Sequence, residues 1–138
     1  MIPQPDNTED AVGSYQIVDV NEVESPNGVF RALTDPLGVG GFRINQLELA
    51  PGAEGPEHDH TKNDQEEVYA VVAGSGVLRT GGGEIPLRPG HFVYLQPDAR
   101  RQMVAGDQGL TWIGITVTWY CGRQQRQIRG RAKHLGAA

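Results

Sequence analysis

Glycine and proline interrupt this chain so often that long helices have almost no room to form. The 19 glycines and 9 prolines are spread through the sequence and are not gathered in one linker. The longest stretch that lacks both residue types, 57–73, ends in a β-branched and aromatic run that is typical of a strand. Because an ordinary helix needs about 8–20 uninterrupted residues, the sequence predicts an all-β fold.

Short apolar segments recur between turn signals at the spacing of an all-β sandwich or barrel. We expect a small antiparallel β-barrel in which residues 15–120 form a single domain, residues 1–14 a flexible N-terminal arm and residues 121–138 a basic C-terminal tail. The expected strands are 15–20, 29–33, 41–49, 58–60, 67–73, 76–80, 84–87, 91–95, 101–105 and 110–120.

Cysteine content and the N-terminal sequence indicate a cytoplasmic protein. Cys121 is the single cysteine, so no disulfide forms within the chain and a structural zinc site of the cysteine type is excluded. Residues 1–6 lack the positive start and the apolar run of a signal peptide. No stretch approaches the roughly 20 apolar residues of a membrane-spanning helix, so we expect no membrane partner.

Charge is distributed unevenly along the chain. Residues 1–118 carry all 17 acidic residues, whereas five of the 12 Lys and Arg fall in residues 119–138. An acidic body of this kind argues against nucleic acid as the main partner. The basic tail is either a solvated chain end or a contact for RNA, for an acidic protein or for the body of a neighbouring subunit.

Two histidines and a carboxylate form the main candidate site. His58 and His60 share one face of an extended segment, because alternate residues of a strand point to the same side. If the strand that opens with Glu66 and Glu67 pairs with this segment, one of the two carboxylates lies beside the imidazoles. Such a set suits a first-row divalent metal ion, although an ordinary acidic surface loop would have a similar spacing.

The same stretch resembles the first sequence motif of the cupin superfamily. Gly52, His58, His60, Glu67 and Gly74 follow the pattern G-x5-H-x-H-x(3,4)-E-x6-G, except that six residues separate His60 from Glu67. The resemblance covers about residues 42–118. It implies a cupin or jelly-roll barrel with His58, His60 and Glu67 as ligands of zinc, nickel, iron or manganese inside it. The x6-G spacing selects Glu67 over Glu66.

The second cupin motif lacks its histidine, which in the family is the fourth metal ligand. Counting on from Gly90 places Arg101 at that position. Arginine stays protonated and cannot ligate a metal, so the ligand set is incomplete. Two arrangements remain open: the three remaining ligands hold a metal while Arg101 faces an anionic substrate, or Arg101 neutralises Glu67 in a metal-free barrel.

These features leave two functions open. One is a metal-dependent enzyme that acts on a small carboxylate-bearing substrate, and the other is a non-catalytic barrel that binds or senses a small molecule without metal. No catalytic residue is assigned. We also expect a homodimer, in which strand 15–20 adds to the sheet of the partner. Predicted substrate-binding residues are Arg43, Tyr69, Arg101, Met103 and Trp112.

Overall fold

The computed structural model describes residues 14–62 and 64–118, and almost all of its regular structure is β. Helix is limited to a 3-10 turn at Val20–Glu22 and to α1, Thr34–Leu37. The strands are β1 Phe30–Ala32, β2 Arg43–Leu49, β3 Gln65–Thr80, β4 Gly83–Leu87, β5 Phe92–Leu95 and β6 Arg101–Thr118. Within the described residues, no helix is long and apolar enough to cross a membrane.

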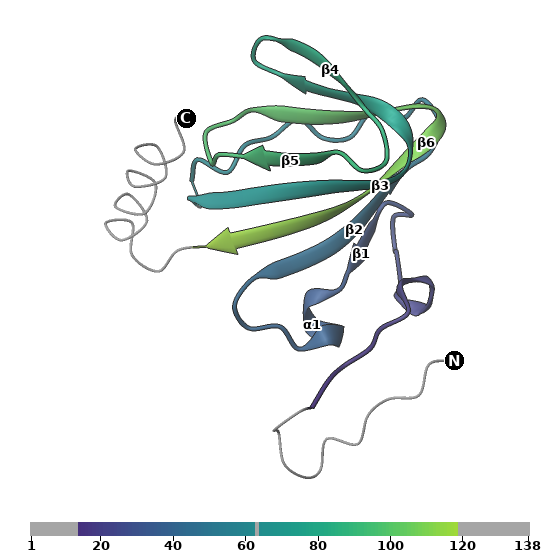
Figure 1. Cartoon of the computed structure of the whole chain (residues 1–138), viewed down its shortest axis with the longest axis vertical. Coiled ribbons are helices and arrows are strands. Elements are labelled where there is room, and N and C mark those ends of the chain that lie inside the picture. The colour runs from purple at the N-terminus through teal and green to yellow at the C-terminus, as the bar shows by residue number, and fades with distance from the viewer. Residues whose placement is uncertain (1–13, 63, 119–138) are drawn as a thin grey trace.

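All the strand pairs are antiparallel, which confirms the predicted fold class (Figure 1). The strand order is β1-β2-β6-β3-β4. β5 pairs with residues 67–70 of β3, on the edge of β3 that does not pair with β6. The long strands β3 and β6 run side by side over most of their length. They form the spine from which the barrel curves.

A glycine bulge bends both long strands. Gly74 (φ 79°), which lies opposite Leu110, and Gly109 (φ 76°) adopt left-handed backbone conformations, and a Cβ on Gly74 would collide with the Gly109 carbonyl. The pairing register shifts between Val71 and Gly76, so the buried side of β3 changes from odd-numbered to even-numbered residues. Bulges of this kind bend a sheet while keeping the apolar side chains inside.

Several predicted strand boundaries are wrong. The predicted breaks at 74–75 and 106–109 are bulges within the continuous strands β3 and β6, because the glycines there bend the paired chains instead of reversing them. Residues 15–19 have no regular structure, and the segment ends in the 3-10 turn. The histidine segment 58–60 makes only an isolated bridge. The N-terminal arm 1–13, the end of the last strand and the tail 121–138 lie outside the described residues.

Inward-facing residues form layers that change from polar to apolar along the barrel. Across β2, β6 and β3, the first layer is Arg43, Thr116 and Glu67, followed by Asn45, Gly114 and Tyr69, then Leu47, Trp112 and Val71. The next layer contains Leu49 and Leu110, both buried in the core. The sheet therefore places its polar groups together at one end of an apolar interior.

Candidate functional site

Glu67 is the centre of a buried polar network at the polar end of the barrel. Its Oε1 atom accepts hydrogen bonds from the Tyr69 hydroxyl at 3.0 Å and from Arg101 Nη2 at 2.6 Å. Its Oε2 atom accepts a hydrogen bond from the Thr116 hydroxyl at 3.2 Å. Tyr69 and Thr116 face inward from β3 and β6, so strand register brings both hydroxyl groups to the Glu67 carboxylate.

Both histidines of the segment before β3 approach the same carboxylate. Nε2 of His60 lies 3.2 Å from Glu67 Oε1, and Nε2 of His58 lies 4.0 Å from it. The two imidazole rings meet edge to face, with centroids 5.2 Å apart. Ligand atoms of the three residues all lie within 4.8 Å of one another, so this group could hold a metal ion.

The backbone around the histidines is held by β6 and not by β3. His58 and Arg101 exchange two backbone hydrogen bonds, of 3.0 and 2.9 Å, and the His60 amide donates to the Pro97 carbonyl at 2.8 Å. Pairing of the histidine segment with the strand that opens at Glu66, on which the sequence-based prediction was conditional, does not occur, yet Glu67 still lies beside both imidazoles. The six residues between His60 and Glu67 let the chain cross to β3 after pairing with β6.

Arg101 is completely buried and is bound to Glu67. Its Nη1 atom donates to the carbonyls of Ala99 and Gln96, and its Nη2 atom donates to Glu67. None of its side-chain surface is exposed. The side chain thus lies at the position counted for the missing histidine and neutralises the carboxylate of the triad, as in the second of the two arrangements that the sequence left open.

Burial and the neighbouring cations control the protonation of the site. Burial lowers the pKa of His60, and the positive charge of Arg101 adds to this effect while Glu67 opposes it. Burial also raises the pKa of Tyr69, and the negative charge of Glu67 contributes, so the phenol stays protonated and donates to the carboxylate. Near neutral pH the lowered pKa of His60 therefore favours its neutral imidazole form.

The site opens into a cavity of about 410 Å³. The triad lines its wall together with Arg43, which is exposed and occupies the same cross-strand row as Thr116 and Glu67. Two strand spacings separate Arg43 from Glu67 in this row, about 10 Å between their backbones. The cavity is lined by Phe30, Arg43, Asn45, Leu47, Pro56, His58, His60, Gln65, Glu67, Tyr69, Gly114 and Thr116.

The five residues predicted to bind substrate line two different spaces in the barrel. Arg101, Met103 and Trp112 lie deeper, around a chamber of about 40 Å³, whereas Arg43 lines the open cavity and Tyr69 lines both spaces. Glu66 faces away from the triad and accepts a hydrogen bond from Tyr94. The carbonyls of Gln96 and Ala99, which hold Arg101, were not predicted, since backbone acceptors leave no signal in the sequence.

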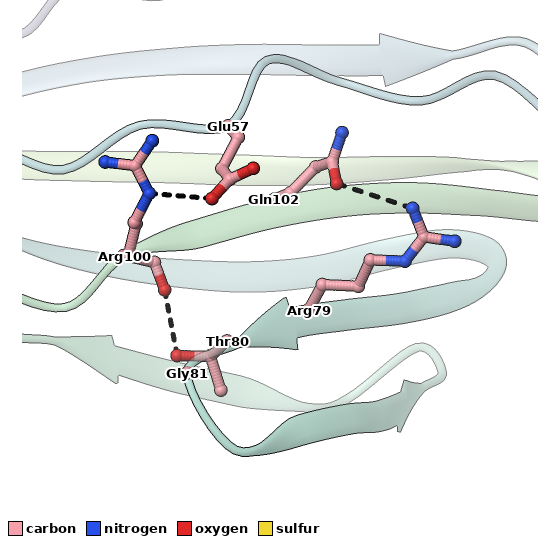
Figure 2. Close-up of a pocket in the computed structure, with 6 residues that line it drawn as sticks. All are labelled: Glu57, Arg79, Thr80, Gly81, Arg100 and Gln102. Carbon is pink, nitrogen blue, oxygen red and sulfur yellow. Dashed lines mark hydrogen bonds and ion pairs between the residues drawn. The ribbon is translucent and has the colours of Figure 1, made fainter.

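A second hollow, of about 180 Å³, lies between Arg79 and Arg100 (Figure 2). Both guanidinium groups already have acidic partners: Arg79 pairs with Glu54 and Glu84, and Arg100 pairs with Glu57. These carboxylates cancel the positive charge that would attract an anion. The hollow therefore lacks the charge of an anion-binding site.

Comparison with known proteins finds a matching family model and a curated relative. The family model described as "Cupin domain" matches residues 45–116, which is more than half of the chain. Glucose-6-phosphate isomerase from Pyrococcus abyssi is 38% identical over 79 residues, covering 49% of this chain. The chain spans less than half the length of that relative (42%).

Solved structures show the same fold. A cupin protein from Bacteroides fragilis is 26% identical, with a TM-score of 0.62 over 77% of this chain and 86% of the other. A sugar phosphate isomerase of the cupin superfamily from Silicibacter pomeroyi is also 26% identical, with a TM-score of 0.65 over 75% of this chain and 76% of the other. A predicted oxalate decarboxylase from Thermotoga maritima, 16% identical with a TM-score of 0.64 over 75% of this chain and 100% of the other, shares the fold.

Proposed function

Because the chain belongs to the cupin domain family, we propose that its barrel binds a small organic anion next to a divalent metal ion. One observation carries the proposal: three convergent ligand atoms and the unburied cation Arg43 share the wall of one 410 Å³ cavity. Ligand-binding cavities are commonly about 300–1,000 Å³ and carry a few convergent polar groups among apolar walls.

His58, His60 and Glu67 would hold the ion. Two imidazoles and one carboxylate suit zinc, nickel, iron or manganese, and the lowered pKa of His60 favours the neutral imidazole that ligation needs. When bound, the ion would supply a Lewis acid that polarises a substrate oxygen. Arg101 would add an opposing charge through the shared carboxylate, so we expect binding to be weaker than in a barrel with four protein ligands.

A phosphorylated sugar is the ligand class that the relatives favour. Two of them carry the names glucose-6-phosphate isomerase and sugar phosphate isomerase. Arg43 would pair with the anionic group at the open side of the cavity. Asn45 also lines the cavity, and its side-chain amide would hydrogen-bond to a sugar hydroxyl. Isomerisation of such a sugar is the activity that we assign.

A metal-free binding barrel is the second candidate. The 2.6 Å bond between Arg101 and Glu67 favours it, because the guanidinium already neutralises the carboxylate that an ion would use. In this form the cavity would bind the same class of anion without catalysis. The two candidates differ in whether ligand affinity depends on added metal.

Calorimetric titration with glucose 6-phosphate, before and after loading with Mn²⁺, tests the proposal. We expect saturable binding by the loaded protein and conversion of the sugar phosphate to its ketose isomer. Arg43→Gln should weaken binding by about tenfold or more, because a charge-assisted contact is lost. Arg88→Gln is the matched control, since this exposed arginine does not line the cavity.

Each outcome of this titration separates the two candidates. Equal binding with and without Mn²⁺, and no conversion, would support the metal-free barrel. Absence of any saturable binding, or equal effects of Arg43→Gln and Arg88→Gln, would contradict an anion site at Arg43.

A further inference from the structure

A small inner chamber lies deeper in the barrel than the open cavity. Its volume is about 40 Å³, and it shares Leu47, Pro56, His58 and Tyr69 with the lining of the open cavity. The two spaces are therefore neighbours, and residues of the candidate site border both of them. Folded proteins contain few voids larger than a water molecule, so a chamber of this size beside the site differs from ordinary core packing.

The wall of the chamber is almost entirely apolar. Besides the four shared residues, it is lined by Val29, Leu49, Gly55, Arg101, Met103 and Trp112. Nε of Arg101 and Nε1 of Trp112 are inaccessible, so neither offers a hydrogen bond inside the chamber. The Tyr69 hydroxyl is already bonded to Glu67. Because a buried water molecule needs two to four polar partners, water is a poor occupant of this space.

The volume of the chamber limits the size of its occupant. One water molecule needs about 10–15 Å³ of cavity volume, so about three non-hydrogen atoms fit. Burying a hydroxyl or a charged group against an apolar wall costs free energy, whereas burying a methyl or methylene group is favourable. An alkyl group of about one to three carbon atoms satisfies both limits.

We infer that the inner chamber is an apolar subsite that receives the alkyl end of the ligand. The inference rests on the proposed function for the other end, whose anionic group pairs with Arg43. Arg43 and Leu47 both line the cavity from β2 and are four residues apart, about 13 Å along the strand. A ligand that joins them passes His58, which borders both spaces. Among sugar phosphates, the subsite favours those whose far end is a methyl group.

Calorimetric titration of the full-length protein, without added metal, with methyl, ethyl, propyl, butyl, pentyl and hexyl phosphate tests the subsite. Each compound carries the same anion for Arg43, and only the length of its apolar end changes. Affinity should rise about fourfold for each methylene group that enters the chamber, and the rise should stop once the chamber is full.

Methionine labelled with ¹³C in its methyl group reports where the alkyl end lies. The chain has two methionines, Met1 and Met103, and Met103 lines the chamber. Its methyl resonance, assigned by its loss in Met103→Leu, should shift with the alkyl phosphates that gain affinity and should stay in place with methyl phosphate.

Val29 offers a matched pair of variants, because it lines the chamber and not the open cavity. Val29→Ala enlarges the chamber, so affinity should go on rising to a longer chain. Val29→Leu fills part of the chamber, so the rise should stop at a shorter chain. Both variants should bind methyl phosphate as the wild-type protein does. A general loss of stability would not move the two profiles in opposite directions.

The outcomes separate this inference from the proposed function. Equal chain-length profiles in the three proteins, or no shift of the Met103 methyl resonance, would overturn the inner subsite and leave the open cavity as the anion site. Failure of every alkyl phosphate to bind would contradict the anion site at Arg43, and xenon would then test the chamber alone, since a dry apolar cavity binds it without any anion. A xenon-dependent shift of the Met103 resonance that Val29→Leu reduces would support the apolar subsite, and its absence would overturn it.

Discussion

At the scale of single residues, the replacement of a histidine by Arg101 decides the character of the site. A histidine at this position would offer a fourth ligand, whereas arginine offers only donors and a permanent positive charge. The protein accommodates the charge by burying it against Glu67 and two carbonyls. Both the affinity for metal and the stability of the barrel therefore depend on one ion pair.

Removing Arg101 should destabilise the fold strongly. Arg101→Gln leaves the buried carboxylate of Glu67 without its cation, and losing one partner of a buried pair costs about 3–5 kcal/mol. Urea denaturation gives the change in the free energy of unfolding. Arg100→Gln, one position earlier and largely exposed, is the control and should cause little change, because an exposed ion pair contributes little to stability.

Two results would contradict this role for Arg101. One is equal stability of Arg101→Gln and Arg100→Gln. The other is a double variant, Glu67→Gln with Arg101→Gln, that loses the full sum of the two single losses, because two groups that interact do not act additively.

Stability should also depend on pH through His60. Burial lowers the pKa of His60 in the folded protein, below the usual value of 6.5, so the unfolded chain takes up this proton first as the pH falls. The stabilisation from a neutral His60 is therefore complete above about pH 6.5 and is lost as the pH falls through the folded pKa.

An NMR titration of the imidazole protons in the metal-free protein measures this pKa. We expect a midpoint below 6.5 for His60. Arg101→Gln should raise the midpoint, since it removes a cation and leaves Glu67 unopposed, and Arg100→Gln should not move it. A midpoint of His60 above 6.5 in the wild-type protein would contradict the prediction.

At the scale of the elements, the glycine bulge in β3 and β6 connects the site to the rest of the barrel. Glu67 and Tyr69 face inward before the bulge, and Leu78 faces inward after it. On β6 the bulge also changes which residues face inward, so that both Arg101 before it and Trp112 after it point into the barrel. Without the change of register, one half of each strand would turn its core side chains outward.

Gly74→Ala should disrupt the glycine bulge. The residue has φ of 79°, and an added Cβ would meet the backbone of Gly109 and Leu110, which cannot move like a flexible side chain. We expect a loss of about 2 kcal/mol or more in the free energy of unfolding, measured by urea denaturation. Gly81→Ala is the control, because nothing lies within 4 Å of a Cβ there. Equal losses in both variants would show that the bulge does not need glycine.

The sequence predicted the strands better than their connections. Alternating apolar residues and turn sequences located the positions of β2, β4 and β5 to within about two residues. The sequence could not show that Gly74 packs against the backbone of Gly109 in a bulge, because a left-handed glycine serves a turn and a bulge equally well. It also could not show that the histidine segment pairs with Arg101, since pairing partners depend on tertiary packing.

At the scale of the whole molecule, one outer face of the sheet is unusually apolar. The cross-strand row Ile44, Ile115, Val68 and Tyr94 runs over β2, β6, β3 and β5, and Phe92 lies beside it with 76% of its surface exposed. Monomeric proteins rarely expose large contiguous apolar patches. This face is a better candidate for a dimer contact than residues 15–19, which form no strand.

We therefore propose that two copies pair through this face. Light scattering at micromolar concentration should give the mass of a dimer, and Phe92→Lys should shift it toward the monomer by burying a charge in the contact. Arg88→Glu, on an exposed turn, is the control for a change of charge alone. A monomer mass for the wild-type protein would contradict the proposal.

We propose that His58, His60 and Glu67 hold a divalent ion despite Arg101, and metal content after equilibration with Mn²⁺ or Zn²⁺ tests this most directly. Elemental analysis should find one exchangeable ion per wild-type chain, tighter binding in Arg101→His, and none in His58→Ala or Glu67→Ala. Glu66→Ala should keep its ion, because Glu66 bonds to Tyr94 on the other face. A wild-type protein that takes up no ion, together with an Arg101→His variant that gains none, would contradict the claim.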